Sequence, residues 1–225
     1  MKIIINESQL RLIIENEESI KLCPIPSDLI NSEGGVDIAM DIYNNKKDIK
    51  GWDGIKVIGS FNFYDMEDDI YSDIISFFNE IVYISGNLVL PVGDYENSFN
   101  KLKGIKGNLR GSDLWEISLP ELEYIGGDAD LQSSAIKSLP KLKKVDGYLH
   151  LSKSNIVSLP ELKYVGKSLG LRQTEIEDLP KLEYVGGKMV LMGTPLSKKI
   201  VSMSEEDRVK FMKKINAQGE ILLWK

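Results

Sequence analysis

Cysteine and histidine are almost absent from this sequence of 225 residues, which contains one of each, Cys23 and His150. A single thiol excludes an internal disulfide framework and a zinc site built from several thiolates, and a single imidazole excludes a zinc site that needs two histidines. The chain also lacks an uninterrupted apolar run of about 18 residues, the length that a membrane-spanning helix needs. We therefore expect no metal ion, no other cofactor and no membrane partner.

Basic residues are fewer than acidic residues in this sequence. The 28 lysines and arginines are outnumbered by 34 aspartates and glutamates, so the net charge is −6, and the arginines are Arg11, Arg110, Arg172 and Arg208. Proteins that bind nucleic acid need clustered basic side chains that displace counterions from the phosphates. We therefore expect no nucleic-acid partner. The hydrophobic fraction of 42% and the charged fraction of 28% are typical of a globular protein.

A repeat of twenty residues dominates the second half of the chain. The dipeptide Leu-Pro begins at residues 119, 139, 159 and 179. The repeat units, which we call rungs, read LPELEYIGGDADLQSSAIKS, LPKLKKVDGYLHLSKSNIVS, LPELKYVGKSLGLRQTEIED and LPKLEYVGGKMVLMGTPLSK. Apolar residues recur at the same places in every rung, as in the column Leu122, Leu142, Leu162 and Leu182. A fixed period with aligned apolar columns predicts a solenoid, in which each rung stacks on its neighbours.

Weaker copies of the rung extend the pattern toward the N-terminus, over 101–120, 79–90 and 53–63. We therefore expect a solenoid over residues 52–200, regular from about residue 101. Residues 1–51 are expected to form a cap containing a strand and a helix, and residues 201–225 a second cap. In the second cap, Ser204 is suited to begin a helix, Gly219 to end it, and the final ILLWK to lie along the last rung.

Within a rung, the alternation of Leu149, His150 and Leu151 predicts a half-buried strand. The glycines at 126, 147, 166 and 186 indicate tight turns with positive φ or close backbone approach, and the prolines indicate corners. Twenty residues are too few to hold a full helix in addition to a strand and two corners. We therefore expect one strand, one extended return and two turns in each rung.

The pattern LxxLPxLxxV(G)GxLxLxxS/TxIxxLP resembles a leucine-rich repeat. It departs from that family by one extra residue between the Val145 and Leu149 positions, and by Ser154 or Thr174 where the family has asparagine. The resemblance implies a right-handed solenoid whose strand face binds partners, and it implies no reaction. The expected fold is mostly β with some α: a right-handed leucine-rich-repeat-like β-solenoid with helix-containing caps at both ends.

The opening KIIINESQLRLII resembles the starts of predicted bacteriophage proteins. That resemblance implies synthesis in the cytoplasm of a host cell. A single unpaired thiol and the absence of an export signal also favour an intracellular, cytoplasmic location.

Side chains between the buried leucines of the strand are expected to point outward together and to contact a protein partner, because they vary while the apolar columns do not. The candidates are Arg110, Asp128, Asp130, Gln132, Tyr148, His150, Ser152, Arg172, Lys188 and Met192. A second column, Tyr124, Tyr164 and Tyr184, is broken by Lys144. We interpret this column as packing between rungs, and ligand binding there is the alternative.

No nucleophile or general base has a recognisable catalytic context in this sequence, and His150 is interpreted as a surface residue. The leading hypothesis is therefore a non-enzymatic protein-binding scaffold, with a host or defence protein as the partner if the gene belongs to a phage. One alternative is a structural or assembly component of a virion or cell surface. The other is an enzyme or metal site in the irregular region 20–80, built from Asp37, Asp41, Asp53 or the acidic residues of 65–69.

Overall fold

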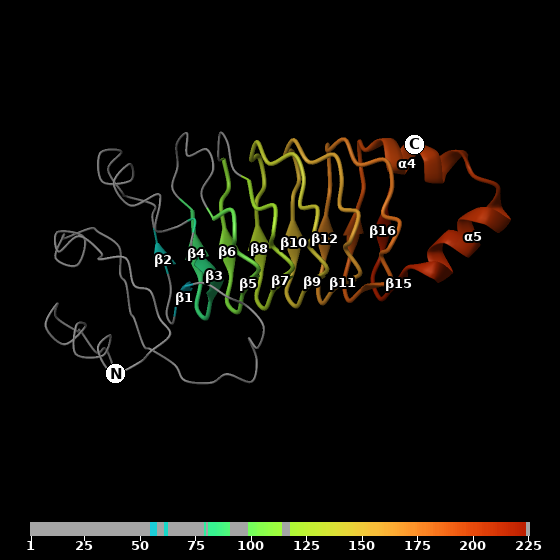
Figure 1. Ribbon diagram of the computed structural model, residues 1–225. Helices are drawn as coiled ribbons and strands as arrows, with labels where there is room; N and C mark the ends of the chain where they lie inside the picture. The colour runs from blue at the N-terminus through green and yellow to red at the C-terminus, as the bar shows by residue number, and fades with distance from the viewer. Residues whose placement is uncertain are drawn as a thin grey trace, which may run out of the picture.

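The computed structural model describes residues 55–57, 61–62, 79, 81–90, 99–113 and 118–223. This part of the chain is a β-solenoid of stacked rungs with two helices near its C-terminal end (Figure 1). The architecture is mostly β, and it confirms the stacked twenty-residue repeat. The expected N-terminal cap, residues 1–51, lies outside the described residues.

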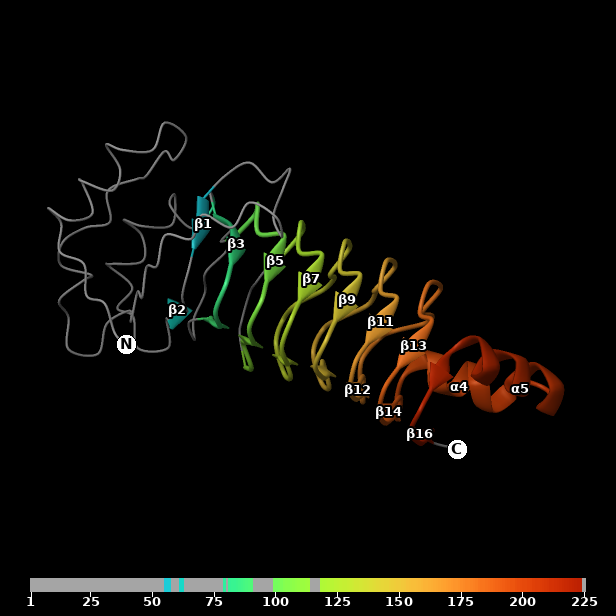
Figure 2. The same cartoon turned by 90° about the horizontal axis from the view of Figure 1, so that it is seen from below.

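Each rung contributes two short strands, so the solenoid has two parallel eight-stranded sheets that run along its length (Figure 2). Sheet A consists of β1 (Ile55–Val57), β3 (Ile81–Ile84), β5 (Gly104–Ile105), β7 (Tyr124–Ile125), β9 (Lys144–Val145), β11 (Tyr164–Val165), β13 (Tyr184–Val185) and β15 (Asn216–Ala217). Sheet B consists of β2 (Phe61–Asn62), β4 (Leu88–Val89), β6 (Leu109–Arg110), β8 (Ala129–Asp130), β10 (Leu149–His150), β12 (Leu169–Gly170), β14 (Met189–Val190) and β16 (Ile221–Leu222).

The register of both sheets follows the period of the sequence. Leu149 pairs with Ala129 on one side and with Leu169 on the other, so equivalent residues of successive rungs lie side by side. The last pairing departs from this period, because Met189 pairs with Ile221 and the intervening chain holds the two helices. The pairing of β16 with β14 confirms that the final segment lies along the last rung.

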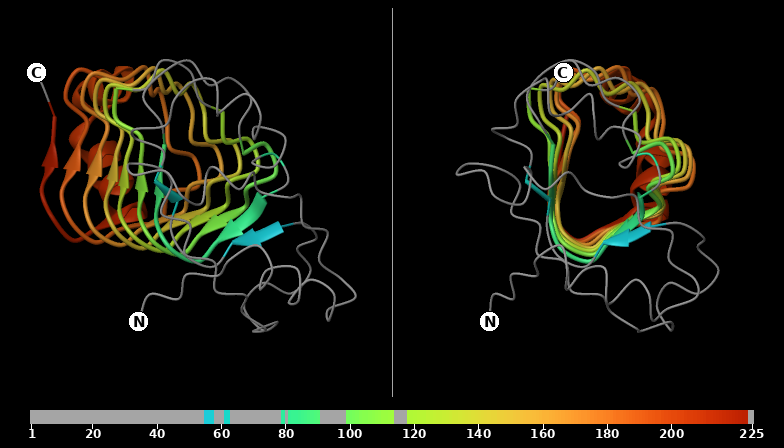
Figure 3. Two further views of the ribbon diagram at one scale, coloured as in Figure 1. Left: turned by 90° about the vertical axis from the view of Figure 1, so that its left-hand side faces the viewer. Right: turned by 60° about the vertical axis from the view of Figure 1, so that its left-hand side comes forward.

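Viewed obliquely along the stack, successive rungs follow nearly the same path (Figure 3), and their apolar columns form one continuous core. Leu122, Val145, Leu169 and Ile176 are each fully buried and represent four of these columns. Because every buried side chain contacts equivalent side chains in the rungs on either side, burial is shared along the stack, as the sequence predicts.

Sheet A corrects the expectation of one strand in each rung. The segments around Tyr124 and Tyr164 are strands as well, with one outward and one buried residue each. The leucine–histidine–leucine strand is confirmed as β10 of sheet B.

The corner glycines allow close approach between rungs, not a positive φ. A Cβ at Gly166 would collide with the carbonyl oxygen of Asp146 in the preceding rung. The left-handed corner lies elsewhere, two residues beyond each buried leucine of the 131, 151, 171 and 191 positions. It is occupied by Ser133, Lys153, Gln173 and Gly193, with φ values of 54°, 62°, 56° and 79°.

The buried hydroxyl column stabilises the same corner from inside. The hydroxyls of Ser134, Ser154, Thr174 and Thr194 each donate to the carbonyl oxygen three residues earlier, at 2.7–2.8 Å. These bonds stay within one rung. A hydroxyl has only one proton to donate, so this corner is closed within its own rung.

Two helices separate the last two rungs. α4 (Pro195–Ser202) begins at Thr194, whose hydroxyl accepts a hydrogen bond from the Ser197 amide at 2.9 Å. α5 (Glu205–Lys214) begins at Ser204, as predicted, but it ends at Lys214 and not at Gly219, because the chain returns to sheet A at β15.

Arg208 joins the two helices. Its guanidinium donates to the carbonyl oxygens of Ile200, Val201 and Met203, at 3.3, 3.0 and 3.3 Å, which lie at the C-terminal end of α4. A cation at this end of a helix satisfies carbonyls that have no helical partner. Toward the end of α5, Ile215 is buried and Met212 packs on the core, whereas Val209 is 45% exposed.

Candidate functional site

The outward side of sheet B, which we call the sheet B face, gathers the candidate residues named from the sequence. Within the sheet, Arg110 pairs in register with Asp130, Asp130 with His150, and His150 with Gly170, so these residues form one row across four rungs. The row continues at Val190 and ends at Leu222, which is 36% exposed. Beside it run two further outward columns, Asn108, Asp128, Tyr148, Ser168 and Lys188, and Ser112, Gln132, Ser152, Arg172 and Met192.

Asp128 and its column hold the rungs together. The Asn108 carboxamide oxygen accepts a hydrogen bond from the Asp128 amide at 2.7 Å, and an Asp128 carboxylate oxygen accepts one from the Tyr148 amide at 3.1 Å. Asp128 also forms an ion pair with Lys167 at 3.1 Å, and Lys188 forms one with Glu220 at 3.3 Å. The structure thus gives Asp128 and Lys188 partners within the chain, which sequence reasoning did not foresee.

His150 and Asp130 form the centre of the row. The His150 Nδ1 lies 3.7 Å from an Asp130 carboxylate oxygen, a separation at which attraction depends on protonation of the imidazole. The other edge of the ring leans over Gly170, where a Cβ would come 2.9 Å from the His150 Cδ2. Because Gly170 presents no side chain, the histidine ring fills part of the position above it.

Arg110 and Arg172 differ from the other charged residues of the face. Both side chains are exposed, and no hydrogen bond or ion pair to another residue of the described ranges reaches either guanidinium. Arg208, by contrast, uses its guanidinium to cap α4. Two of the three described arginines are therefore displayed on one face, and neither guanidinium has a partner among the described residues.

Sheet A carries the tyrosine column, and its side chains contact one another. Lys144 lies over the rings of Tyr124 and Tyr164, with its Nζ 5.6 and 5.3 Å from the ring centroids. The Tyr164 and Tyr184 rings stack at 4.9 Å with an interplanar angle of 10°. The ring faces thus contact side chains of neighbouring rungs. This arrangement favours the packing interpretation of this column.

Asp146 joins this column at its middle. The Tyr124 hydroxyl donates to the Asp146 carboxylate at 2.6 Å, and the Lys144 ammonium lies 2.7 Å from the same group. Burial, followed by this hydrogen bond to Asp146, raises the pKa of Tyr124 to about 12. Burial alone would raise the pKa of Asp146, but hydrogen bonds from Lys144 and Tyr124 outweigh it and hold that pKa below its ordinary value.

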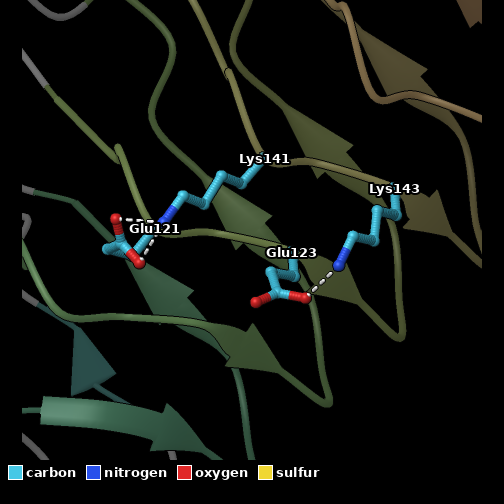
Figure 4. Close-up of polar contacts among 4 residues, drawn as sticks. All are labelled: Glu121, Glu123, Lys141 and Lys143. Carbon is cyan, nitrogen blue, oxygen red and sulfur yellow. Dashed lines mark hydrogen bonds and ion pairs between the residues drawn. The ribbon is translucent and has the colours of Figure 1, made fainter.

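Beside the tyrosine column, charges of opposite sign alternate from rung to rung. Figure 4 shows Lys141 bound to both carboxylate oxygens of Glu121, at 2.6 and 2.7 Å, and Lys143 bound to Glu123 at 2.6 Å. Lys181 and Glu161 repeat the first of these pairs further along the stack. These three ion pairs satisfy their charges within the chain, in contrast to the arginines of the sheet B face.

Within the described ranges, no group of three or more histidine, cysteine, aspartate or glutamate side chains could hold a metal ion. None of the helices there has the length and apolar character to cross a membrane. The region 20–80, where the alternative enzyme or metal site was placed, lies outside the described residues except for 55–57, 61–62 and 79.

One member of the face was missed by sequence reasoning. Leu222 follows the two helices, so its place in the row beyond Val190 does not follow from the twenty-residue period. The available signal was the apolar segment at 221–223, which was expected along the last rung without assignment to the face. A scan against family models and searches of curated proteins and of solved structures give no match to this chain.

Proposed function

We propose that this chain is a non-enzymatic protein-binding scaffold and that its partner contacts the sheet B face. In this proposal the stack is a right-handed, leucine-rich-repeat-like solenoid that displays a fixed set of side chains. The observation that carries it is the contrast between the two sheets. Glu121, Glu123 and Glu161 beside sheet A each pair with a lysine of the next rung, whereas Arg110 and Arg172 on sheet B have no partner in the described part of the chain.

A rigid display surface suits this role. The backbone of the face is fixed by hydrogen bonds to both neighbouring rungs, as when the Leu149 amide donates to Ser168 and the Leu131 amide donates to His150. Little backbone freedom is lost when such a surface binds, so more of the contact energy contributes to affinity. A bacteriophage origin, which the opening residues suggest, would make the partner a host or defence protein in the host cytoplasm.

The test is affinity capture with two matched triple variants. Asp130→Ala, His150→Ala and Arg172→Ala together remove three side chains from the face in three successive rungs. Lys137→Ala, Asn155→Ala and Glu177→Ala remove three exposed side chains from the return segments of the same rungs. We expect the first variant to lose a bound protein that the wild type and the second variant retain, with all three proteins folded by circular dichroism. An unchanged set of bound proteins in the first variant would refute the proposal.

A further inference from the structure

The sheet B face changes character along the stack. At one end it presents Arg110, and three rungs further along it presents Arg172. In the next rung the outward residues are Val190 and Met192, both partly exposed, and the edge strand adds Leu222. The face therefore offers two guanidinium groups followed by an apolar area.

Guanidinium groups without a partner favour a carboxylate-bearing ligand. The planar guanidinium binds carboxylates through two parallel hydrogen bonds, which are stronger than bonds between neutral groups. Asp130 lies next to Arg110 in register, but within the described ranges it forms no ion pair with Arg110, and its carboxylate lies 3.7 Å from the His150 Nδ1. Charge complementarity thus points to an acidic partner for this face.

The spacing of the rungs limits the shape of that partner. Parallel strands lie about 4.8 Å apart, so three rungs place the Arg110 and Arg172 backbones about 14 Å apart along the stack. An extended chain advances about 3.3 Å per residue, so this distance corresponds to about four residues. Val190 lies one rung further, which corresponds to about six residues from the start. Residues separated by four and by six positions lie on the same side of an extended chain.

We propose that the sheet B face binds an extended acidic segment of a partner protein that lies along the stack. One carboxylate contacts Arg110, a second carboxylate four residues later contacts Arg172, and an apolar side chain two residues beyond that contacts Val190 and Met192. This inference rests on the proposed function and specifies its partner.

The experiment uses the full chain and a fluorescent peptide with glutamates at its first and fifth positions, leucine at its seventh and serine or threonine elsewhere. Binding is measured by fluorescence anisotropy at low salt and again at high salt. We expect saturable binding that Arg110→Ala with Arg172→Ala weakens at least tenfold, and that high salt weakens because exposed charges are screened. A peptide with glutamine in place of both glutamates should bind at least tenfold more weakly.

The matched control removes two exposed lysines from other surfaces, Lys137→Ala with Lys163→Ala, and should change the affinity less than twofold. No binding to the wild type, an equal loss in both double variants, or equal binding of the glutamine peptide would each overturn the inference. The proposed function fails separately, when the triple face variant captures the same proteins as the wild type. Loss of capture by that variant without peptide binding would reject the acidic segment and leave the scaffold role standing.

Discussion

In the four regular rungs, Asp146 stands in a column whose other members, Gly126, Gly166 and Gly186, are glycine. This one exchange introduces a carboxylate between a tyrosine and a lysine, and both contact it directly. A hydrogen bond from the Tyr124 hydroxyl to a carboxylate is stronger than a bond between neutral groups. Side-chain contacts between β7 and β9, at the centre of sheet A, thus involve a residue that departs from the repeat.

The raised pKa of Tyr124 has a consequence for stability at high pH. The folded pKa of about 12 lies above the ordinary value of 10.0, so at intermediate pH the unfolded chain releases a proton that the folded chain retains. The stabilisation from this group is complete below pH 10 and is lost as the pH rises toward 12. We therefore expect the wild type to lose more free energy of unfolding over this interval than Tyr124→Phe does, as measured by urea denaturation at a series of pH values.

Two controls accompany this measurement. Asp146→Asn should lower the pKa of Tyr124 in an ultraviolet titration but leave it above 10.0, because burial is the larger cause of the shift. Tyr164→Phe removes a hydroxyl that has no carboxylate partner among the described residues, and it should leave the titration of Tyr124 in place. Equal pH dependence in the wild type and Tyr124→Phe would contradict the assignment.

At the scale of the element, two glycines of one rung differ in the group that an added Cβ would meet. Gly166 lies against the backbone of the preceding rung, and Gly170 lies beneath the movable ring of His150. We expect Gly166→Ala to lower the free energy of unfolding by about 1–3 kcal/mol, as overpacking against a fixed group does. Gly170→Ala should cost less than about 1 kcal/mol, because the ring can turn aside.

Thermal and urea denaturation of the two alanine variants would measure this difference. Both variants add one methyl group to the same rung, so each controls for the lost freedom of glycine in the unfolded chain. Equal destabilisation would show that the close approach at Gly166 is not limiting.

The strands of sheet B could be predicted from the sequence, whereas those of sheet A could not. In sheet B, Leu149, His150 and Leu151 alternate long enough to give a period of two. In the regular rungs of sheet A, the strand residues and their flanks, such as Lys163, Tyr164, Val165 and Gly166, do not alternate between apolar and polar, so they show no period of two. α4 was missed for another reason: Thr194 and Leu196 match the hydroxyl and apolar columns of the repeat, so the rung pattern hides the start of a helix.

At the scale of the whole molecule, a fixed period makes rungs removable. Deleting residues 141–160 joins Pro140 to Glu161 and keeps every apolar column aligned, so we expect a folded protein with a lower free energy of unfolding and a smaller m-value. The deletion also places Glu161 beside Glu121. Glu161 keeps Lys181 as its partner on the other side, so the added repulsion from Glu121 should cost at most about 1 kcal/mol.

Circular dichroism and urea denaturation would check these outcomes. Deleting residues 141–150 instead removes both strands of a rung but leaves its return segment, and this variant should not regain the β-sheet signal of the wild type. A half-rung deletion as stable as the full-rung deletion would show that stacking does not depend on the period.

For the site, the sequence predicted which residues lie on the face but not which of them have partners within the chain. It placed Arg110, Arg172, Asp128 and Lys188 on one face, because alternation determines which side chains point outward. It could not distinguish the arginines that lack a partner from the two residues that have one, since ion pairs depend on side-chain reach across neighbouring rungs.

The hydrogen bonds between rungs run along the stack, as in the bond from the Leu149 amide to Ser168. Tension applied to the two ends would therefore load successive rungs in series and pull them off one at a time. Each rung that yields releases about 65–70 Å of extended chain, at about 3.3–3.6 Å per residue. Under such tension the stack would therefore lengthen rung by rung from its ends, while the rungs between them stay paired.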